Sequence, residues 1–214
     1  MSIVVRTLSD QIFTIVRERI VSGKLLTDQP IRQDALANEL GVSKIPLREA
    51  LGRLEHEGLL FNHANRGYFV RPMSAEEAEE IFALRLSIEP EAVAMAAVAA
   101  TDEERQAARD ALTALDIAAA DHLDHVAARN RDFHMALVRP GHRLLTTQLI
   151  ERLQVLSERY VQKHLEPAGR EHRAHAEHQV LLNAWIAADG ARAKQLASAH
   201  IQATLEDLRR QLRG

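Results

Sequence analysis

The chain has 214 residues, of which 46% are hydrophobic, 27% charged and 4% aromatic, and it contains no cysteine. That length suffices for one large domain or two small ones, and the lack of cysteine excludes a disulfide scaffold, a thiolate metal site and a cysteine nucleophile. No apolar run approaches the ~20 residues of a membrane span, and no signal-peptide core is present near the start, so we expect a cytoplasmic protein without a membrane partner.

The formal charge of −3 is unevenly distributed along the chain. Residues 1–72 contain 10 Lys and Arg against 8 Asp and Glu, whereas residues 73–214 contain 17 against 22, together with 9 of the 11 His. A mildly basic first part and an acidic, histidine-rich second part predict two domains, 1–72 and 73–214, with different partners.

The first domain begins with the pattern of three short helices. Apolar residues recur at helical spacing in residues 8–22, and residues 34–40 form a second short helix. Gly41 then allows a turn, Ser43 is a suitable N-cap for a third helix, and Gly58 ends that helix. Two short helices separated by a glycine turn are typical of a helix-turn-helix motif.

Two short β-like segments follow the third helix, at residues 59–62 and 67–71. The residues between them, including Arg66, form a hairpin, and Gly67 occupies a position suited to positive φ. Such a wing can place a basic tip in the minor groove of DNA while the neighbouring helix contacts the major groove.

Lys44 and Arg48 are the predicted DNA-contacting residues of the third helix. They lie four residues apart, away from the leucine stripe, in the turns where a docked helix meets bases or phosphates. The alternative is a solvated basic pair in which Arg48 bridges to a neighbouring glutamate. The turn, the cap and the wing together favour DNA, and Ser43 is either a cap alone or also a phosphate contact.

Five stretches of the first domain form a specific pattern: IVSGK (20–24), LANELGVS (36–43), IPLREAL (45–51), LEHEGL (54–59) and RG (66–67). On these stretches, residues 9–71 resemble the winged helix-turn-helix of the GntR family of bacterial transcription regulators. The resemblance implies that Lys44, Arg48 and Gly67 touch DNA, and that dimers bind palindromic operators. Lys44 replaces the commoner arginine, which argues against a bidentate guanine contact there.

The second domain reads as helices throughout. Residues 74–77 and 101–104 each have the sequence of a capping box, and each begins a long alanine-rich amphipathic segment. No strand pattern is present, so we predict an antiparallel six-helix bundle. The predicted helices span residues 74–99, 101–119, 121–138, 142–165, 170–188 and 190–212.

Four residues of this bundle form a candidate metal site. Asn130 and His134 share one face of the third bundle helix, while His178 and His200 lie among apolar residues on the fifth and sixth. Three imidazoles and one amide oxygen suit Zn²⁺ or Ni²⁺ and leave coordination positions for a ligand. The alternative is that each histidine is an ordinary core or surface residue.

Four stretches of the second domain carry a further resemblance: FALRLSIE (82–89), NRDFH (130–134), AEH (176–178) and AHI (199–201). They resemble the FCD ligand-binding domain of the FadR subfamily, and six helices suit its VanR branch. In metal-binding members an Asp and three His hold the ion, which implies Asn130, His134, His178 and His200 here. Asparagine keeps the oxygen donor but removes a negative charge, so a lower metal affinity is expected.

Arg85 is the predicted contact for an effector. It is a lone cation on a mostly apolar face, with Glu89 one turn later. One interpretation is an Arg85–Glu89 pair that only stabilises the helix. The other, which the family resemblance implies, is a bidentate contact of Arg85 with the carboxylate of an organic acid whose other end meets the metal. Tyr160 is a further predicted pocket residue.

The sequence therefore predicts a homodimeric repressor that binds operator DNA and is released by a small carboxylate bound with a divalent metal. Three alternatives stay open: a metal-dependent enzyme, a sensor for which the metal itself is the signal, and a DNA-binding structural protein with an empty bundle. The enzyme is disfavoured because the chain has no HExxH, no GxSxG and no evident general base beside the histidines.

Overall fold

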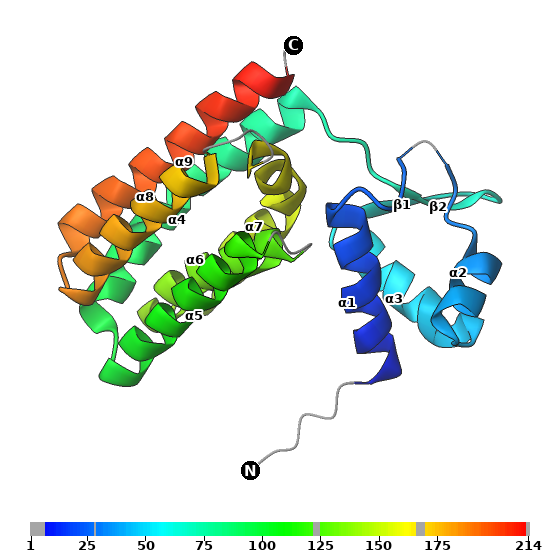
Figure 1. Ribbon diagram of the computed structural model, residues 1–214, viewed down its shortest axis with the longest axis horizontal. Helices are drawn as coiled ribbons and strands as arrows, with labels where there is room; N and C mark the ends of the chain where they lie inside the picture. The colour runs from blue at the N-terminus through cyan, green and yellow to red at the C-terminus, as the bar shows by residue number, and fades with distance from the viewer. Residues whose placement is uncertain (1–6, 28, 122–124, 166–169, 213–214) are drawn as a thin grey trace. The chain divides into compact units, whose positions relative to one another are not determined.

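The computed structural model describes residues 7–27, 29–121, 125–165 and 170–212. The chain divides into two compact units, Met1–Pro72 and Met73–Gly214. The regular secondary structure of the described residues is helical, apart from one two-stranded sheet in the first unit (Figure 1). The predicted mostly α fold, with a winged helix-turn-helix followed by a helical bundle, is confirmed.

The first unit contains α1 (Leu8–Val21), α2 (Gln33–Leu40), α3 (Lys44–His56), β1 (Leu60–His63) and β2 (Gly67–Val70). Val16 of α1 and Leu47 and Leu54 of α3 are fully buried, so the apolar stripe of α3 faces the core of this unit and not the surface. Gly41 ends α2 with φ +66°, a left-handed conformation that glycine adopts without a steric penalty. The predicted turn between α2 and α3 is thus formed.

The wing is an antiparallel hairpin. Leu60 pairs with Val70, and His63 pairs with Gly67 at the end beside the turn. Gly67 has φ +85°, as the hairpin prediction requires. An isolated bridge between Pro30 and Phe69 attaches the segment before α2 to the outer strand.

The second unit contains six α-helices among its described residues, as predicted. Helix α6 begins five residues later than expected, and the predicted start of that helix includes residues 122–124, which lie outside the described residues. The helices are α4 (Ala75–Ala99), α5 (Asp102–Ala120), α6 (Val126–Val138), α7 (Leu144–Leu165), α8 (Arg170–Ile186) and α9 (Gly190–Leu212), with a short 3₁₀ turn at Arg139–Gly141.

The two predicted capping boxes have different outcomes. Thr101 and Glu104 bond reciprocally at the start of α5, as expected. At the start of α4 only half of the box forms, because Ser74 accepts a hydrogen bond from the Glu77 amide while the Glu77 carboxylate accepts one from the Tyr160 hydroxyl at 2.6 Å. The prediction of a full box there is wrong, because a contact from α7 competes for the glutamate.

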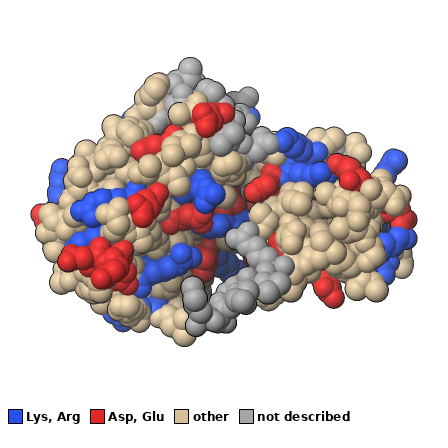
Figure 2. All heavy atoms as spheres, turned by 60° about the horizontal axis from the view of Figure 1, so that its bottom comes forward, with Lys and Arg blue, Asp and Glu red and all other residues tan. Residues whose placement is uncertain are grey.

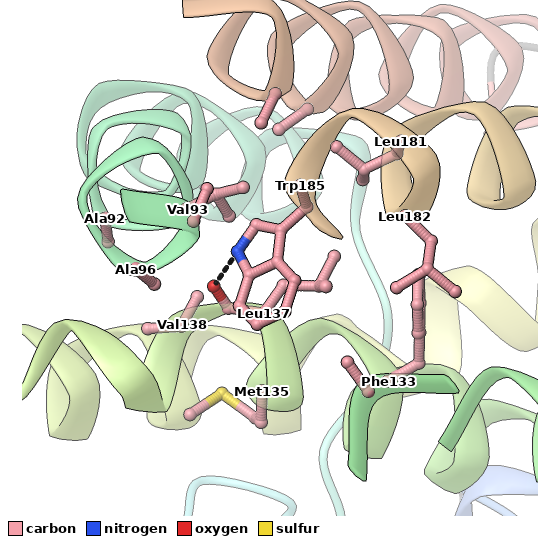
Figure 3. Close-up of a cluster of buried hydrophobic side chains, with 14 of the residues drawn as sticks. Ala92, Val93, Ala96, Phe133, Met135, Leu137, Val138, Leu181, Leu182 and Trp185 are labelled. Carbon is pink, nitrogen blue, oxygen red and sulfur yellow. Dashed lines mark hydrogen bonds between the residues drawn. The ribbon is translucent and has the colours of Figure 1, made fainter. Parts of the chain in front are cut away.

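Trp185 of α8 lies at the centre of the bundle core (Figure 3). Its side chain is fully buried, and its indole nitrogen donates a hydrogen bond to the Leu137 carbonyl of α6 at 3.1 Å. Small residues of α4, Ala92 and Ala96, pack in the same cluster. Small side chains let helices approach closely, which suits the low aromatic content of the chain.

Helix α9 packs very closely against α4 where it begins. A Cβ atom at Gly190 would lie 2.8 Å from the Ala94 carbonyl oxygen, closer than real Cβ atoms approach other atoms. Glycine is therefore required at this position for steric reasons.

Both ends of α8 are held by arginines. At its carboxyl end, Arg105 of α5 donates to the carbonyls of Trp185 and Ile186 at 3.2 and 2.7 Å. At its amino end, Arg170 and Arg173 contact the fully buried carboxylate of Asp207 on α9. These contacts fix the helix that carries His178.

No helix among the described residues is both long enough and apolar enough to cross a membrane.

Candidate nucleic-acid and metal sites

The predicted DNA-contacting residues of α3 lie on its exposed side. Lys44 forms an ion pair with Asp34 of α2, and its side chain is 55% exposed. Arg48 donates a hydrogen bond from Nε to Gln33 Oε1 at 3.2 Å and is also exposed. These exposed contacts hold both cations beside the first turns of α3 without burying them.

Ser43 occupies the N-cap position of α3 but does not act as a side-chain cap. Its backbone is extended, with φ −76° and ψ 162°, and its hydroxyl makes no capping hydrogen bond. The expectation that this side chain caps α3 is therefore wrong. Because the residue is exposed, its hydroxyl is accessible at the helix amino terminus, where anions bind favourably.

The tip of the wing presents a third exposed cation. Arg66 is exposed, and its backbone amide closes the turn on the His63 carbonyl at 2.9 Å. On the face of the molecule that Figure 2 shows, basic and acidic side chains are interspersed. Neither sign of charge therefore dominates that face.

The structure brings together three of the four residues predicted to bind metal. His134 of α6, His178 of α8 and His200 of α9 are buried, and one potential ligand nitrogen from each lies within 4.8 Å of the others. Asn130 is also buried, one turn before His134 on the same helix. Residues from three helices thus converge, as the sequence predicted.

Two carboxylates orient the imidazoles. Glu177 Oε2 lies 2.7 Å from Nδ1 of His200, and Glu89 Oε1 lies 3.2 Å from Nδ1 of His134. A carboxylate on one ring nitrogen leaves the other nitrogen of that ring available to a metal. Accordingly, Nε2 of His134 is buried and has no hydrogen-bond partner among the described residues.

Burial keeps two of these histidines, His134 and His178, neutral. Desolvation lowers the pKa of His134 from 6.5 to about 4, although the hydrogen bond and charge of Glu89 oppose the shift. Burial, together with the neighbouring His200 and His134, lowers the pKa of His178 well below its usual value. Neutral imidazoles carry the lone pairs that metal binding requires. The donor set and the unpartnered nitrogen therefore fit a divalent metal.

Arg85 lies in a buried polar network. Its side chain is 3% exposed, and its Nε and Nη2 donate to Glu89 Oε2 and Oε1 at 2.9 and 3.2 Å. Its Nη1 donates to Ser157 Oγ at 3.3 Å. The predicted helix-stabilising pair is thus present, and a contact of Arg85 with an effector stays a prediction.

Tyr160 is buried, but its hydroxyl is engaged at the start of α4. It donates to Glu77 and accepts a hydrogen bond from the Ser74 amide at 3.1 Å. Desolvation and Glu77 raise the pKa of this phenol. Its predicted contact with an effector is untested, and the hydrogen bonds found here join α7 to the start of α4.

Sequence reasoning missed several polar residues that surround the histidines. Glu177 is adjacent to His178 in the sequence, yet it contacts His200. Gln154 and Ser157 lie one turn apart on α7, and both are buried. Their spacing on one face of an amphipathic helix is the sequence signal that could have identified them.

Comparison with known proteins decides the family. The domain of bacterial regulatory proteins of the gntR family matches residues 8–70, and the FCD domain matches residues 80–203, more than half of the chain. The chain belongs to the GntR family. The FCD domain fits the FadR-like subfamily, as the sequence predicted.

Curated relatives of this GntR protein are also regulators. It is 36% identical to the Nta operon transcriptional regulator of Aminobacter aminovorans over 118 residues, which span 55% of this chain and 56% of that protein. It is 30% identical to the HTH-type transcriptional repressor GlaR of Escherichia coli over 210 residues, which span 93% and 94%.

A solved structure shows the same fold. The GntR protein superposes on E. coli McbR/YncC with a TM-score of 0.79 and 23% identity, over 96% of this chain and 98% of that one. The chain is a transcriptional regulator with a DNA-binding helix-turn-helix domain and an FCD domain. These relatives support the expectation of a regulator in preference to an enzyme.

Proposed function

We propose that this GntR-family regulator represses transcription from an operator and releases the DNA when a small organic acid binds in the bundle together with Zn²⁺ or Ni²⁺. The observation that carries the ligand half of this proposal is the convergence of three buried histidines from three helices. A DNA partner implies a cytoplasmic location. Repression, in preference to activation, is supported by GlaR, a transcriptional repressor that this chain matches over nearly its whole length.

The DNA contacts would come from α3 and the wing. Lys44 and Arg48 would exchange their contacts with Asp34 and Gln33 of α2 for contacts with phosphates or base edges. The contacts given up are exposed and therefore weak. The uncapped hydroxyl of Ser43 would donate to a phosphate. Arg66 and the backbone at Gly67 would enter the minor groove at the wing tip.

The metal would be held by Asn130, His134, His178 and His200. When bound, the ion would offer open coordination positions to an oxygen atom of an organic acid. Burial holds His134 and His178 neutral, and carboxylates orient His134 and His200. Because the four donors are uncharged, the site favours an anionic ligand over a neutral one.

A second copy of the chain would complete the regulator. Helix α7 exposes Leu144, Leu145 and Leu149, which are 74%, 70% and 50% exposed, and the neighbouring α4 exposes Val98 at 68%. Exposed large apolar residues on adjacent helices are typical of an interface. A homodimer would pair two recognition helices with the two halves of a palindromic operator.

The experiment compares metal content, acid response and DNA binding in one set of variants. His134→Ala combined with His178→Ala should lose bound metal and the response of operator binding to organic acids, while DNA binding itself persists. His175→Ala, an exposed histidine of α8, is the matched control and should behave as the native protein. An unchanged acid response in the double variant would show that the histidines are structural.

A metal sensor is the second candidate, because the donors of Arg85 are already engaged by Glu89 and Ser157. In that case metal alone would change operator binding. The two functions are separated by adding Zn²⁺ or Ni²⁺ to the metal-free protein without any organic acid and measuring operator binding.

A further inference from the structure

The carboxylate of Glu89 is enclosed by hydrogen-bond donors from three helices. Its Oε1 accepts from Gln154 Nε2 at 2.8 Å and from Arg85 Nη2 at 3.2 Å, and lies 3.2 Å from Nδ1 of His134. Its Oε2 accepts from Arg85 Nε at 2.9 Å. Only 1% of the residue is exposed, so the carboxylate is shielded from solvent.

This donor set matches what proteins use to recognise a free carboxylic acid. A guanidinium binds both oxygens, and an amide and an imidazole fix the orientation. The carboxylate in this structure is supplied by the chain itself, from the helix that also carries Arg85. Arg85 forms an ion pair with this carboxylate, and its guanidinium contacts both carboxylate oxygens. The group is therefore an anion.

Charge determines how a second carboxylate could reach Arg85. Placing it beside Glu89 would bring two like charges together in a buried site, which is strongly unfavourable. Replacing Glu89 by an incoming carboxylate conserves the charge and the hydrogen bonds, so an exchange avoids this penalty. The exchange requires the two methylene groups of Glu89 to rotate, so that its carboxylate leaves Arg85 as the incoming one arrives.

We propose that Glu89 occupies the position that the carboxylate of the effector takes, and that effector binding exchanges one carboxylate for another on Arg85. The inference rests on the proposed function and specifies how its acid site is regulated. It adds Gln154 as an effector contact, since Gln154 donates to the oxygen that the effector would replace. It also makes Glu89 an internal competitor that sets the acid concentration needed for a response.

Chemical rescue of Glu89→Ala tests this exchange. Acetate equals the fragment that the substitution removes, and acetamide is its uncharged analogue. Acetate should raise the melting temperature of the variant bundle by roughly 5 °C at saturation, and acetamide should not. The native protein should show no such rise, because its own carboxylate fills the position.

The matched control is Glu79→Ala. Glu79 also makes a two-oxygen contact with an arginine, Arg209, but both side chains are more than a third exposed. Acetate should not rescue this variant, because water replaces the carboxylate there. Equal effects of acetate and acetamide on Glu89→Ala, or equal rescue of both alanine variants, overturns the proposal.

Glu89→Gln keeps the test decisive should the alanine variant not fold. The amide keeps the shape but removes the charge, so acetate should stabilise this variant at concentrations that leave the native protein unchanged. No acetate-specific stabilisation in either variant rejects the exchange. The proposed function and the carboxylate exchange can fail separately. If acetate rescues the variants but no acid releases the native protein from its operator, the proposed function is rejected alone. If acids release the native protein but acetate rescues neither variant, the exchange is rejected alone.

Discussion

The Nε2 atoms of His178 and His200 lie 3.2 Å apart, although 22 residues separate the two histidines in the sequence. At this distance the two nitrogens can share one hydrogen, or both can direct a lone pair at a common cation. Glu177 fixes the orientation of the His200 ring, because its carboxylate accepts a hydrogen bond from Nδ1. This favours the tautomer in which Nε2 carries the lone pair.

Glu177→Gln should therefore weaken metal binding by about 10- to 100-fold, because the amide no longer fixes the ring orientation or raises its basicity. Competition with a chromophoric chelator measures the affinity. Glu206→Gln on α9 is the control, since Glu206 is exposed and bonded to Gln202. Equal affinities in the two variants would contradict the orienting role of Glu177.

Lys44→Ala and Arg48→Ala should each weaken operator binding and lower the slope of log affinity against log salt by about 1 for each phosphate that the side chain neutralises in the native complex. The helical content should be unchanged, because both side chains are exposed. Fluorescence anisotropy with a labelled operator at several salt concentrations measures both quantities. Arg109→Ala, an exposed cation of α5, is the control. Native slopes in both variants would refute the assignment of α3 as the recognition helix.

The bundle should lose stability as the pH falls from about 6.5 towards 4 in the presence of a chelator. The pKa of His134 is about 4 in the folded chain and 6.5 when exposed, so the unfolded chain binds more protons in this window. The free energy of unfolding then falls by about 1.4 kcal/mol per pH unit for each such histidine. Below about pH 4.5, Glu89 lowers the free energy of unfolding further, because its pKa is about 2 in the folded chain and 4.5 when exposed, so the unfolded chain again binds more protons.

Urea denaturation between pH 5 and 7.5 measures this loss. His134→Gln should reduce the pH dependence by about one proton. A native protein equally stable at pH 5 and pH 7 would show that these histidines are not kept neutral by burial.

Gly190→Ala should destabilise the bundle by about 1–3 kcal/mol, because the added methyl group would overlap the Ala94 carbonyl and force α9 away from α4. Gly141→Ala in the same unit is the control, since its methyl group would meet its nearest neighbours at an ordinary 3.7 Å. Thermal unfolding followed by circular dichroism compares the two. Equal melting temperatures would mean that the two helices pack less closely than described.

The helices were predictable because their signals are local. Periodic apolar residues and glycine or proline breaks gave the bounds of α4 and α9 to within one residue. The half-formed box at Ser74 was not predictable, because Glu77 bonds Tyr160, 83 residues away in the sequence. Local rules describe which bonds a side chain can make, and tertiary packing selects among them.

The candidate site followed the same division. The sequence placed His134, His178 and His200 on separate helices and predicted that they share a metal site, which the family resemblance supported. The roles of Glu89 and Glu177 depend on how α4, α8 and α9 are rotated against their neighbours, which residue spacing does not specify. The i,i+4 pairing of Arg85 with Glu89 was visible in the sequence, but the contacts of Glu89 with α6 and α7 were not.

Arginine contacts at both ends of α8 have a consequence for the affinity of whatever the histidines bind. A helix anchored at its carboxyl end by Arg105 and at its amino end through Asp207 cannot slide or turn without breaking charged contacts. His178 is therefore already in place before a ligand arrives. The loss of conformational entropy needed to gather the imidazoles occurs when the chain folds, so it does not oppose association.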